Sequence, residues 1–114
     1  MPKAIQPKTL VIYADRNGYE PFTEWLEGLR DTKGKQRIQA RLRRLELGLY
    51  GDCESVGDGV MELRLFFGPG YRVYFGEQIG SLVILLCGGD KSTQKQDIEV
   101  AKVYWKEHQD HDAT

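Results

Sequence analysis

The sequence has no long apolar run, only two cysteines and no histidine before His108. Its longest apolar run, Leu82–Cys87, has six residues and is far too short to span a membrane. The segment Met1–Lys8 lacks the apolar stretch of a secretory signal, which predicts a cytoplasmic protein. Cys53 and Cys87 do not follow the spacing of metal ligands, so we expect two reduced thiols and no metal or other cofactor.

The chain also lacks the strong positive charge that is common among nucleic-acid-binding domains. Its formal net charge is -1. The two histidines, His108 and His111, lie in a terminal segment, and we expect them to be mobile surface residues. The charges are unevenly distributed, however. No acidic residue occurs between Thr32 and Leu45, and this segment contains six basic residues: Lys33, Lys35, Arg37, Arg41, Arg43 and Arg44. A surface divided in this way binds a polyanion on one side while the molecule stays near neutral.

At 114 residues, the chain is predicted to form one domain with a single hydrophobic core. Apolar periodicity predicts strands at Thr9–Tyr13, Val60–Leu65, Tyr71–Phe75 and Leu82–Cys87, and helices that begin at Pro21, after Gly34 and after Thr93. The polar segment Gly51–Gly59 is predicted to be a loop, and Gln109–Thr114 a frayed end. The order over residues 1–114 is β-α-α-β-β-β-α, which indicates an α+β domain. We expect a small, mostly antiparallel sheet with helices packed on one face.

Two arginines in adjacent predicted strands are the most informative feature of the sequence. A connection centred on Gly68 and Pro69 places Arg64 opposite the start of the next strand, and the two-residue period of a strand sends Arg64 and Arg72 to the same face. Adjacent guanidinium groups repel each other unless an anion lies between them, and arginine is well suited to phosphate. The pair therefore indicates an RNA or phosphate site. The alternative is that each arginine pairs with a carboxylate, such as Glu62, on a solvated face.

Short motifs follow one another in the second half of the chain. They are Glu62-Leu63-Arg64, Gly68-Pro69-Gly70-Tyr71-Arg72-Val73-Tyr74-Phe75, Leu85-Leu86-Cys87-Gly88-Gly89-Asp90-Lys91, and Asp97-Ile98-Glu99-Val100-Ala101-Lys102. In this order and spacing, the sequence resembles the RelE/ParE superfamily of toxins from type II toxin-antitoxin modules, in particular the HigB-like branch of addiction-module killer proteins. The resemblance extends from Leu10 to about Trp105.

The resemblance implies a RelE-like α+β toxin that cleaves mRNA, commonly on the ribosome. It also implies a cognate antitoxin partner, usually a HigA-like protein with a helix-turn-helix domain. The strand arginines of the family match Arg64 and Arg72, and the basic residue after the last strand matches Lys91. Where the family often has a lysine pair, this chain has Asp90 before Lys91, which removes one positive charge.

Cleavage of RNA without a metal uses the neighbouring 2′-hydroxyl as nucleophile and requires a base, an acid and cations on the phosphate. We expect Arg64 and Arg72 to bind the phosphate. Lys91 would add charge or act as the acid, or would be a solvated turn residue. Glu62 is the nearest candidate base because it shares a face with Arg64, although it would also serve to neutralise that arginine. Tyr74 shares the same face and would either stack on a base or pack.

The predicted contacts to RNA and the ribosome are Lys33, Lys35, Arg37, Arg41, Arg44 and Tyr74. For the basic helix, the alternative is an exposed face that only aids solubility. Two other functions remain open for the whole protein. One is a ParE-like toxin that poisons DNA gyrase without phosphodiester chemistry, and the other is an inactive remnant that still binds an antitoxin.

Overall fold

The computed structural model describes residues 6–112. The elements are β1 (Thr9–Ile12), α1 (Pro21–Gly28), α2 (Thr32–Glu46), β2 (Cys53–Gly57), β3 (Val60–Arg64), β4 (Arg72–Gln78), β5 (Leu82–Gly89), a 3₁₀ turn η1 (Lys91–Thr93) and α3 (Gln94–Asp112). The predicted α+β class and the succession of elements are confirmed, with one addition. β2 is a fifth strand within a segment that was predicted to be a loop. It is short and polar, and its pairing with β3 is irregular between Ser55 and Gly57.

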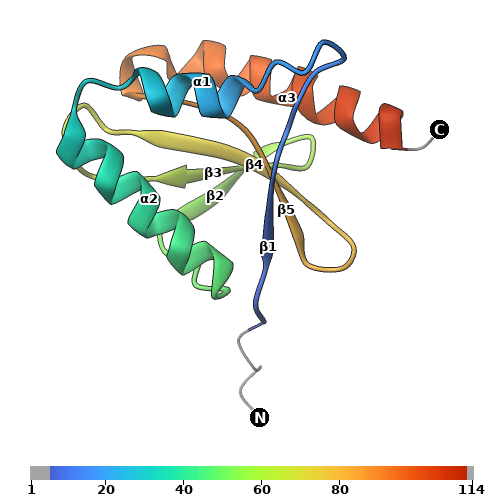
Figure 1. The fold of residues 1–114 in the computed structure, drawn as a ribbon, viewed down its shortest axis with the longest axis horizontal. Helices are drawn as coiled ribbons and strands as arrows, with labels where there is room; N and C mark the ends of the chain where they lie inside the picture. The colour runs from blue at the N-terminus through green and yellow to red at the C-terminus, as the bar shows by residue number, and fades with distance from the viewer. Residues whose placement is uncertain (1–5, 113–114) are drawn as a thin grey trace.

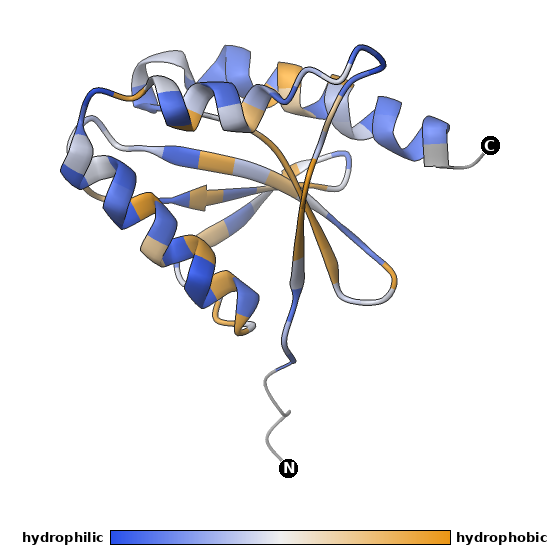
Figure 2. Ribbon diagram, in the orientation of Figure 1, coloured by the Kyte–Doolittle hydropathy of each residue, from blue (hydrophilic) through white to orange (hydrophobic). Residues whose placement is uncertain are grey.

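The strands form one sheet in the order β1-β5-β4-β3-β2 (Figure 1). β1 pairs in parallel with β5, whereas the other neighbouring pairs are antiparallel. β5 lies inside the sheet, as its apolar run predicts, and is coloured as hydrophobic over most of its length in Figure 2. Most residues of β4 and β5 are buried on both faces, so both faces of the sheet require a cover.

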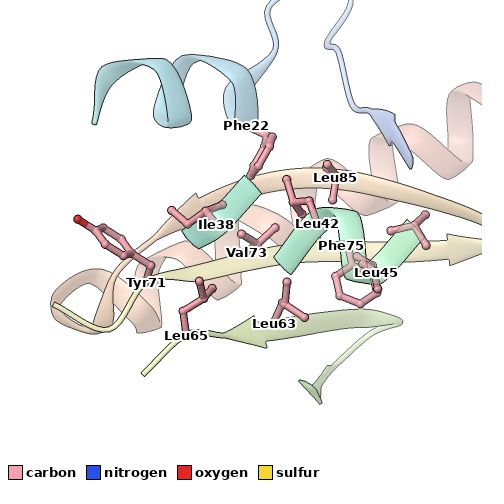
Figure 3. Close-up of a cluster of buried hydrophobic side chains, with 11 residues drawn as sticks. Phe22, Ile38, Leu42, Leu45, Leu63, Leu65, Tyr71, Val73, Phe75 and Leu85 are labelled. Atoms are coloured by element: carbon pink, nitrogen blue, oxygen red, sulfur yellow. The ribbon is translucent and has the colours of Figure 1, made fainter. Parts of the chain in front are cut away.

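Helices cover both faces, which corrects the prediction that they pack on one face only. α1 and α2 lie on one face, where Phe22, Ile38 and Leu45 join a cluster with apolar residues of β3, β4 and β5 (Figure 3). α3 lies on the other face and contributes Ala101 and Trp105 to a second cluster. Because successive residues of a strand point to opposite faces, β3 and β4 present different side chains to α2 and to α3.

Two glycines let tryptophan rings pack directly on the sheet backbone. A Cβ atom at Gly88 would overlap the ring of Trp25 in α1, and one at Gly76 would lie 2.5 Å from a ring carbon of Trp105 in α3. The missing side chains therefore allow each helix to approach the central strands. This close approach places the start of α3 beside the polar residues of β3 and β4.

The beginning of α2 is tied to the loop before β4. One carboxylate oxygen of Asp31, the N-cap residue, accepts a hydrogen bond from the backbone N–H of Gly34 at 3.0 Å. The other oxygen accepts one from the hydroxyl of Tyr71 at 2.8 Å. At the other end of the chain, α3 continues to Asp112, so residues 109–112 are helical and the predicted frayed end is wrong for them. Residues 113 and 114 lie outside the described part of the chain. Within residues 6–112, no helix is long and apolar enough to cross a membrane.

Candidate functional site

The predicted site residues of β3 and β4 lie in two neighbouring rows on the face of the sheet that α3 covers. In one row, Arg64 and Arg72 are direct cross-strand partners, which confirms their predicted juxtaposition. In the other row, Glu62 pairs with Tyr74 on one side and with Glu54 of β2 on the other. Directly opposed residues of antiparallel strands point to the same face, so a cationic row borders an acidic one. The second row neutralises much of the charge of the first.

Arg64 is the accessible member of the arginine pair. Its guanidinium lies 2.9 Å from the Asp52 carboxylate and 2.8 Å from that of Glu54, and 27% of its side chain is exposed. The hydrogen bond that the Arg64 guanidinium donates to Asp52 raises the pKa of Arg64. Glu54 is itself 61% exposed, so solvent reaches this ion pair. An anionic ligand can therefore displace the Glu54 carboxylate from Arg64 at small cost.

Arg72 is buried, with only 8% of its surface exposed. It donates a hydrogen bond to the carbonyl oxygen of Gly70 at 3.1 Å, and its Nε atom lies 3.6 Å from a carboxylate oxygen of Glu62. Glu62 is 2% exposed and is therefore not free to act as a base on a substrate. It pairs with Arg72 rather than with Arg64, which corrects the expectation that it neutralises Arg64. A buried pair of this kind depends on its partners, because an isolated charge would be strongly destabilised.

Tyr74 belongs to the same buried network. Its hydroxyl donates a hydrogen bond to Glu62 at 2.9 Å, and the side-chain amide of Gln94 in α3 donates another at 2.9 Å. Burial and the hydrogen bond to Glu62 raise the pKa of Tyr74. Tyr74 has no exposed surface, so the expectation that it stacks on an RNA base is wrong for this conformation. The ring contributes to packing under α3 instead.

Lys91 lies at the same end of the sheet as the arginines. It is exposed at the start of η1, and its backbone N–H donates to the carbonyl of Pro69 at 3.4 Å. A Cβ atom added at Gly70 would lie 3.4 Å from the Cβ of Lys91 and 3.5 Å from a terminal nitrogen of Arg72. The glycine loop thus brings the lysine next to the buried arginine. Of the four predicted catalytic residues, Lys91 and Arg64 are accessible to solvent, whereas Glu62 and Arg72 are buried.

The basic residues of α2 divide into exposed ones and one that is held by the fold. Lys33, Arg37 and Arg44 are exposed, and Lys35 is partly buried with its amine 3.5 Å from the carbonyl of Glu27. Arg41 differs, because its guanidinium donates to three backbone carbonyls, those of Arg64 at 2.7 Å, Tyr50 at 3.1 Å and Asp52 at 3.3 Å. Burial lowers the pKa of Arg41. Its predicted role in binding RNA is therefore replaced, in this conformation, by a role in holding α2 to the edge of the sheet.

A pocket of about 270 Å³ separates α2 from the loop that follows β3. It is lined by Arg37, Ala40, Arg41, Arg44, Leu65, Phe66 and Phe67. The guanidinium of Arg37 lies over the ring of Phe67, 4.2 Å from its centroid. Phe66 and Glu54 were not among the residues predicted to form the site. The signals in the sequence are the Phe66-Phe67 pair, which interrupts the polar alternation of the strand, and the cluster of acids before β3.

A second pocket, of about 550 Å³, lies between the turn after β1 and the end of α3. His108 lines it, stacks on Trp105 with ring centroids 5.8 Å apart, and has a buried Nε2 atom. This placement corrects the expectation that His108 is a mobile surface residue. The pocket does not include any residue of the predicted site. Within residues 6–112, no three side chains of histidine, cysteine, aspartate or glutamate are grouped to hold a metal ion.

The sequence of this chain matches a known protein family. Residues 24–106 match the family described as phage derived protein Gp49-like (DUF891). The chain is also 54% identical over 86 residues to an uncharacterized protein of Haemophilus influenzae (strain ATCC 51907 / DSM 11121 / KW20 / Rd), and the match covers 75% of this chain and 87% of that protein. The range of the family match contains α2, strands β2 to β5 and all of the predicted site residues.

Proposed function

This chain belongs to the phage derived Gp49-like family, within the RelE/HigB-like toxin superfamily, and we propose that it is a toxin that cleaves mRNA on the ribosome. The family is associated with the toxins of toxin-antitoxin systems, which suggests an antitoxin partner. We propose that this partner is a HigA-like helix-turn-helix protein. It would neutralise the toxin by covering either the cationic end of the sheet or α2.

The observation that carries the nuclease proposal is the cross-strand pair of arginines, of which Arg64 is partly exposed. Arg64 reaches solvent at the end of β3, and its carboxylate partner Glu54 is exposed as well. Lys91 adds an exposed cation next to Arg72. A phosphodiester that binds between Arg64 and Lys91 would thus meet positive charge fixed in place by the sheet, which is the condition for stabilising charge in a transition state.

The proposed chemistry is attack of the 2′-oxygen on the adjacent phosphorus, with cleavage of the bond to the 5′-oxygen. Glu54 is the candidate base for the proton of the 2′-hydroxyl, because it is an exposed carboxylate held at Arg64. Lys91 is the candidate acid for the departing 5′-oxygen. Arg72 and Glu62 act in this proposal as positioning residues, since both are buried beneath the surface that RNA would contact. The exposed basic residues Lys33, Arg37 and Arg44 of α2, together with the partly buried Lys35, would contact ribosomal phosphates.

The test is primer extension on cellular mRNA after brief induction of the wild type, of Arg64→Ala and of Lys91→Ala. We expect cuts in mRNA with the wild type and a loss of about 100-fold with Arg64→Ala, as is typical when one stabilising donor is removed. Arg16→Ala is the matched control, because Arg16 is an exposed arginine in the turn after β1 and outside this site. Unchanged cleavage by Arg64→Ala, with retained helical content, would contradict the proposed role of the sheet.

One observation favours a second candidate, a ParE-like toxin that inhibits DNA gyrase. Arg72 and Glu62 are buried and paired, which is the arrangement expected if the arginines maintain the fold rather than bind a substrate. In that case, purified protein would inhibit supercoiling by gyrase, and induction would leave mRNA intact. Arg64→Ala would then keep its toxicity. If induction of the wild type stops neither growth nor supercoiling, the chain is an inactive remnant of a toxin.

A further inference from the structure

The pocket between α2 and the loop after β3 combines exposed aromatic and cationic surface. Phe66 has 86% of its surface exposed, and it borders Arg37, Arg41 and Arg44 in this pocket. At about 270 Å³, the pocket is smaller than the roughly 300–1,000 Å³ typical of sites that enclose a drug-sized ligand. Its size suits a flat group that rests on one ring.

The positive charge of this pocket is not balanced by the protein. Within residues 6–112, none of the ion pairs involves Arg37 or Arg44, and no acidic residue lines the pocket. Arg41 is held by backbone carbonyls, which add no negative charge. The pocket therefore favours an anionic ligand. Its aromatic residues favour a ligand that also has a flat ring.

Building on the proposed function, we infer that this pocket binds one nucleotide of single-stranded RNA, with its base stacked on Phe66 and its flanking phosphates on Arg37 and Arg44. Aromatic platforms combined with basic side chains are the usual means of binding single strands without sequence preference. The ring of Phe66 is available because it packs against little of its own chain. The neighbouring ring of Phe67 is already covered by Arg37.

The position of the pocket favours RNA over an acidic protein segment. Arg41 lines the pocket and donates a hydrogen bond of 2.7 Å to the backbone carbonyl of Arg64, whose side chain forms the accessible part of the candidate cleavage site. The pocket thus adjoins Arg64 through its backbone, at the end of β3. We infer that a single RNA strand with a phosphate at Arg64 would pass around the end of β3 to Phe66, which follows two residues later in the chain. The pocket would hold the substrate strand beside the reacting bond and so align it.

The inference is tested by fluorescence anisotropy with a short, labelled 2′-O-methyl oligoribonucleotide, which cannot be cleaved because its 2′-oxygens are blocked. We expect Phe66→Ala to weaken binding by about tenfold, in the range known for loss of one stacked base, and Phe66→Trp to retain it. Ile79→Ala is the matched control, since Ile79 is a fully exposed apolar residue in the turn between β4 and β5. Arg37→Ala and Arg44→Ala should each lower the slope of log affinity against log salt by about 1.

Cross-linking gives a second measurement. An RNA that contains 4-thiouridine should form a photo-adduct on the tryptic peptide with Phe66 in the wild type, and the yield should fall in Arg44→Ala. Equal affinity of Phe66→Ala and wild type for the oligonucleotide would overturn the inference. It would also be overturned if only an acidic peptide, such as polyglutamate, bound in a Phe66-dependent way. The two proposals can fail independently. If the wild type binds the oligonucleotide through Phe66 but its induction leaves mRNA intact, the binding site is supported and the nuclease proposal is refuted.

Discussion

The two faces of the sheet are built from the same strands but are stabilised differently. On the face covered by α1 and α2, the buried residues are almost entirely apolar, and Ile38, Leu45 and Leu63 are fully buried (Figure 3). On the face covered by α3, an apolar cluster around Trp105 borders a buried ion pair between Arg72 and Glu62. The first face can tolerate imperfect packing at moderate cost. The second has charged groups that are stable only while every partner is present.

This difference assigns different tasks to the two faces. An apolar core stabilises the fold in proportion to the area that it buries, whereas a buried ion pair contributes little net stability and mainly fixes geometry. The polar face positions the cationic end of the sheet, and the apolar face supports it. One tryptophan lies on each face, Trp25 with α1 and Trp105 with α3. Single-tryptophan variants therefore report the unfolding of each face separately.

The largest effect should come from Glu62→Ala. This change removes the carboxylate that pairs with Arg72 and accepts hydrogen bonds from Tyr74 and Gln94, and it leaves a buried guanidinium without its partner. We expect a loss of about 3–5 kcal/mol in the free energy of unfolding, measured by urea denaturation. The fluorescence of Trp105 should change before that of Trp25.

The double variant Glu62→Leu with Arg72→Met is the control for this prediction. It replaces both members of the ion pair by apolar side chains. Replacing a buried ion pair in this way often leaves the free energy of unfolding unchanged or increases it. We expect it to be more stable than Glu62→Ala. If Glu62→Ala costs less than about 1 kcal/mol, the pair is solvated in solution and the contrast between the faces disappears.

On the apolar face, Ile38→Ala should destabilise the protein by about 3 kcal/mol, because Ile38 is fully buried and its removal leaves a cavity. Urea denaturation at several pH values measures this effect. The loss should be the same at each pH near neutrality, since no titrating group is removed. A loss that varied strongly with pH would mean that the two faces are coupled through the strands between them.

A smaller effect is expected for Asp31→Ala at the junction between α2 and the loop before β4. The hydrogen bond from the backbone of Gly34, followed by that from Tyr71, lowers the pKa of Asp31. A carboxylate with a lowered folded-state pKa stabilises the protein above its unfolded-state pKa, and this contribution is lost as the pH falls through the folded-state value. The variant should therefore melt at a lower temperature than wild type at neutral pH, and the difference should narrow in acid.

Differential scanning calorimetry between neutral and acidic pH measures this narrowing. Asp31→Asn is the matched variant, because asparagine keeps the N-cap acceptor but loses the charge. It should restore most of the melting temperature at neutral pH. A difference between Asp31→Ala and wild type that stays constant down to low pH would show that the charge of Asp31 is not involved.

The smallest effect on stability is expected for Glu54→Gln. Glu54 is 61% exposed, and exposed ion pairs are typically worth less than about 1 kcal/mol, so urea denaturation should hardly change. Cleavage should respond strongly, because loss of a general base commonly costs 100-fold or more in rate. Glu54 and Glu62 are cross-strand partners, so the two variants compare an exposed and a buried carboxylate in the same row. Full cleavage activity of Glu54→Gln would remove Glu54 as the base.

Most of the fold was predictable because periodicity records which faces of an element are buried. The shared face of Arg64 and Arg72 followed from the two-residue period, and the short connection through Gly68 and Pro69 placed Arg64 opposite the start of the next strand, where the structure pairs it with Arg72. The position of α3 was missed, although the run Leu82–Cys87 is apolar on both faces and so needs a cover on each. β2 was missed because a polar edge strand of five residues carries almost no apolar signal.

The site was less predictable because long side chains do not reveal their partners in the sequence. Arg37, Arg41 and Arg44 are all basic residues of the same predicted helix, and the sequence does not distinguish them. The guanidinium of Arg41 nevertheless donates hydrogen bonds to backbone carbonyls instead of facing solvent. The burial of Tyr74 depends on where α3 lies, which the strand pattern alone does not determine. The exposure of Phe66 depends on the path of the loop, and a pair of phenylalanines would ordinarily be expected to pack.

The parallel pairing of β1 with β5 has a consequence during synthesis of the protein. Thr9 pairs with Leu82, so β1 has no pairing partner until β5 has been synthesised, after nearly three quarters of the chain. Gln94, which completes the environment of Glu62, is translated later still. A truncated or nascent chain therefore lacks both the complete five-stranded sheet and the ordered arrangement of Arg64, Arg72 and Lys91.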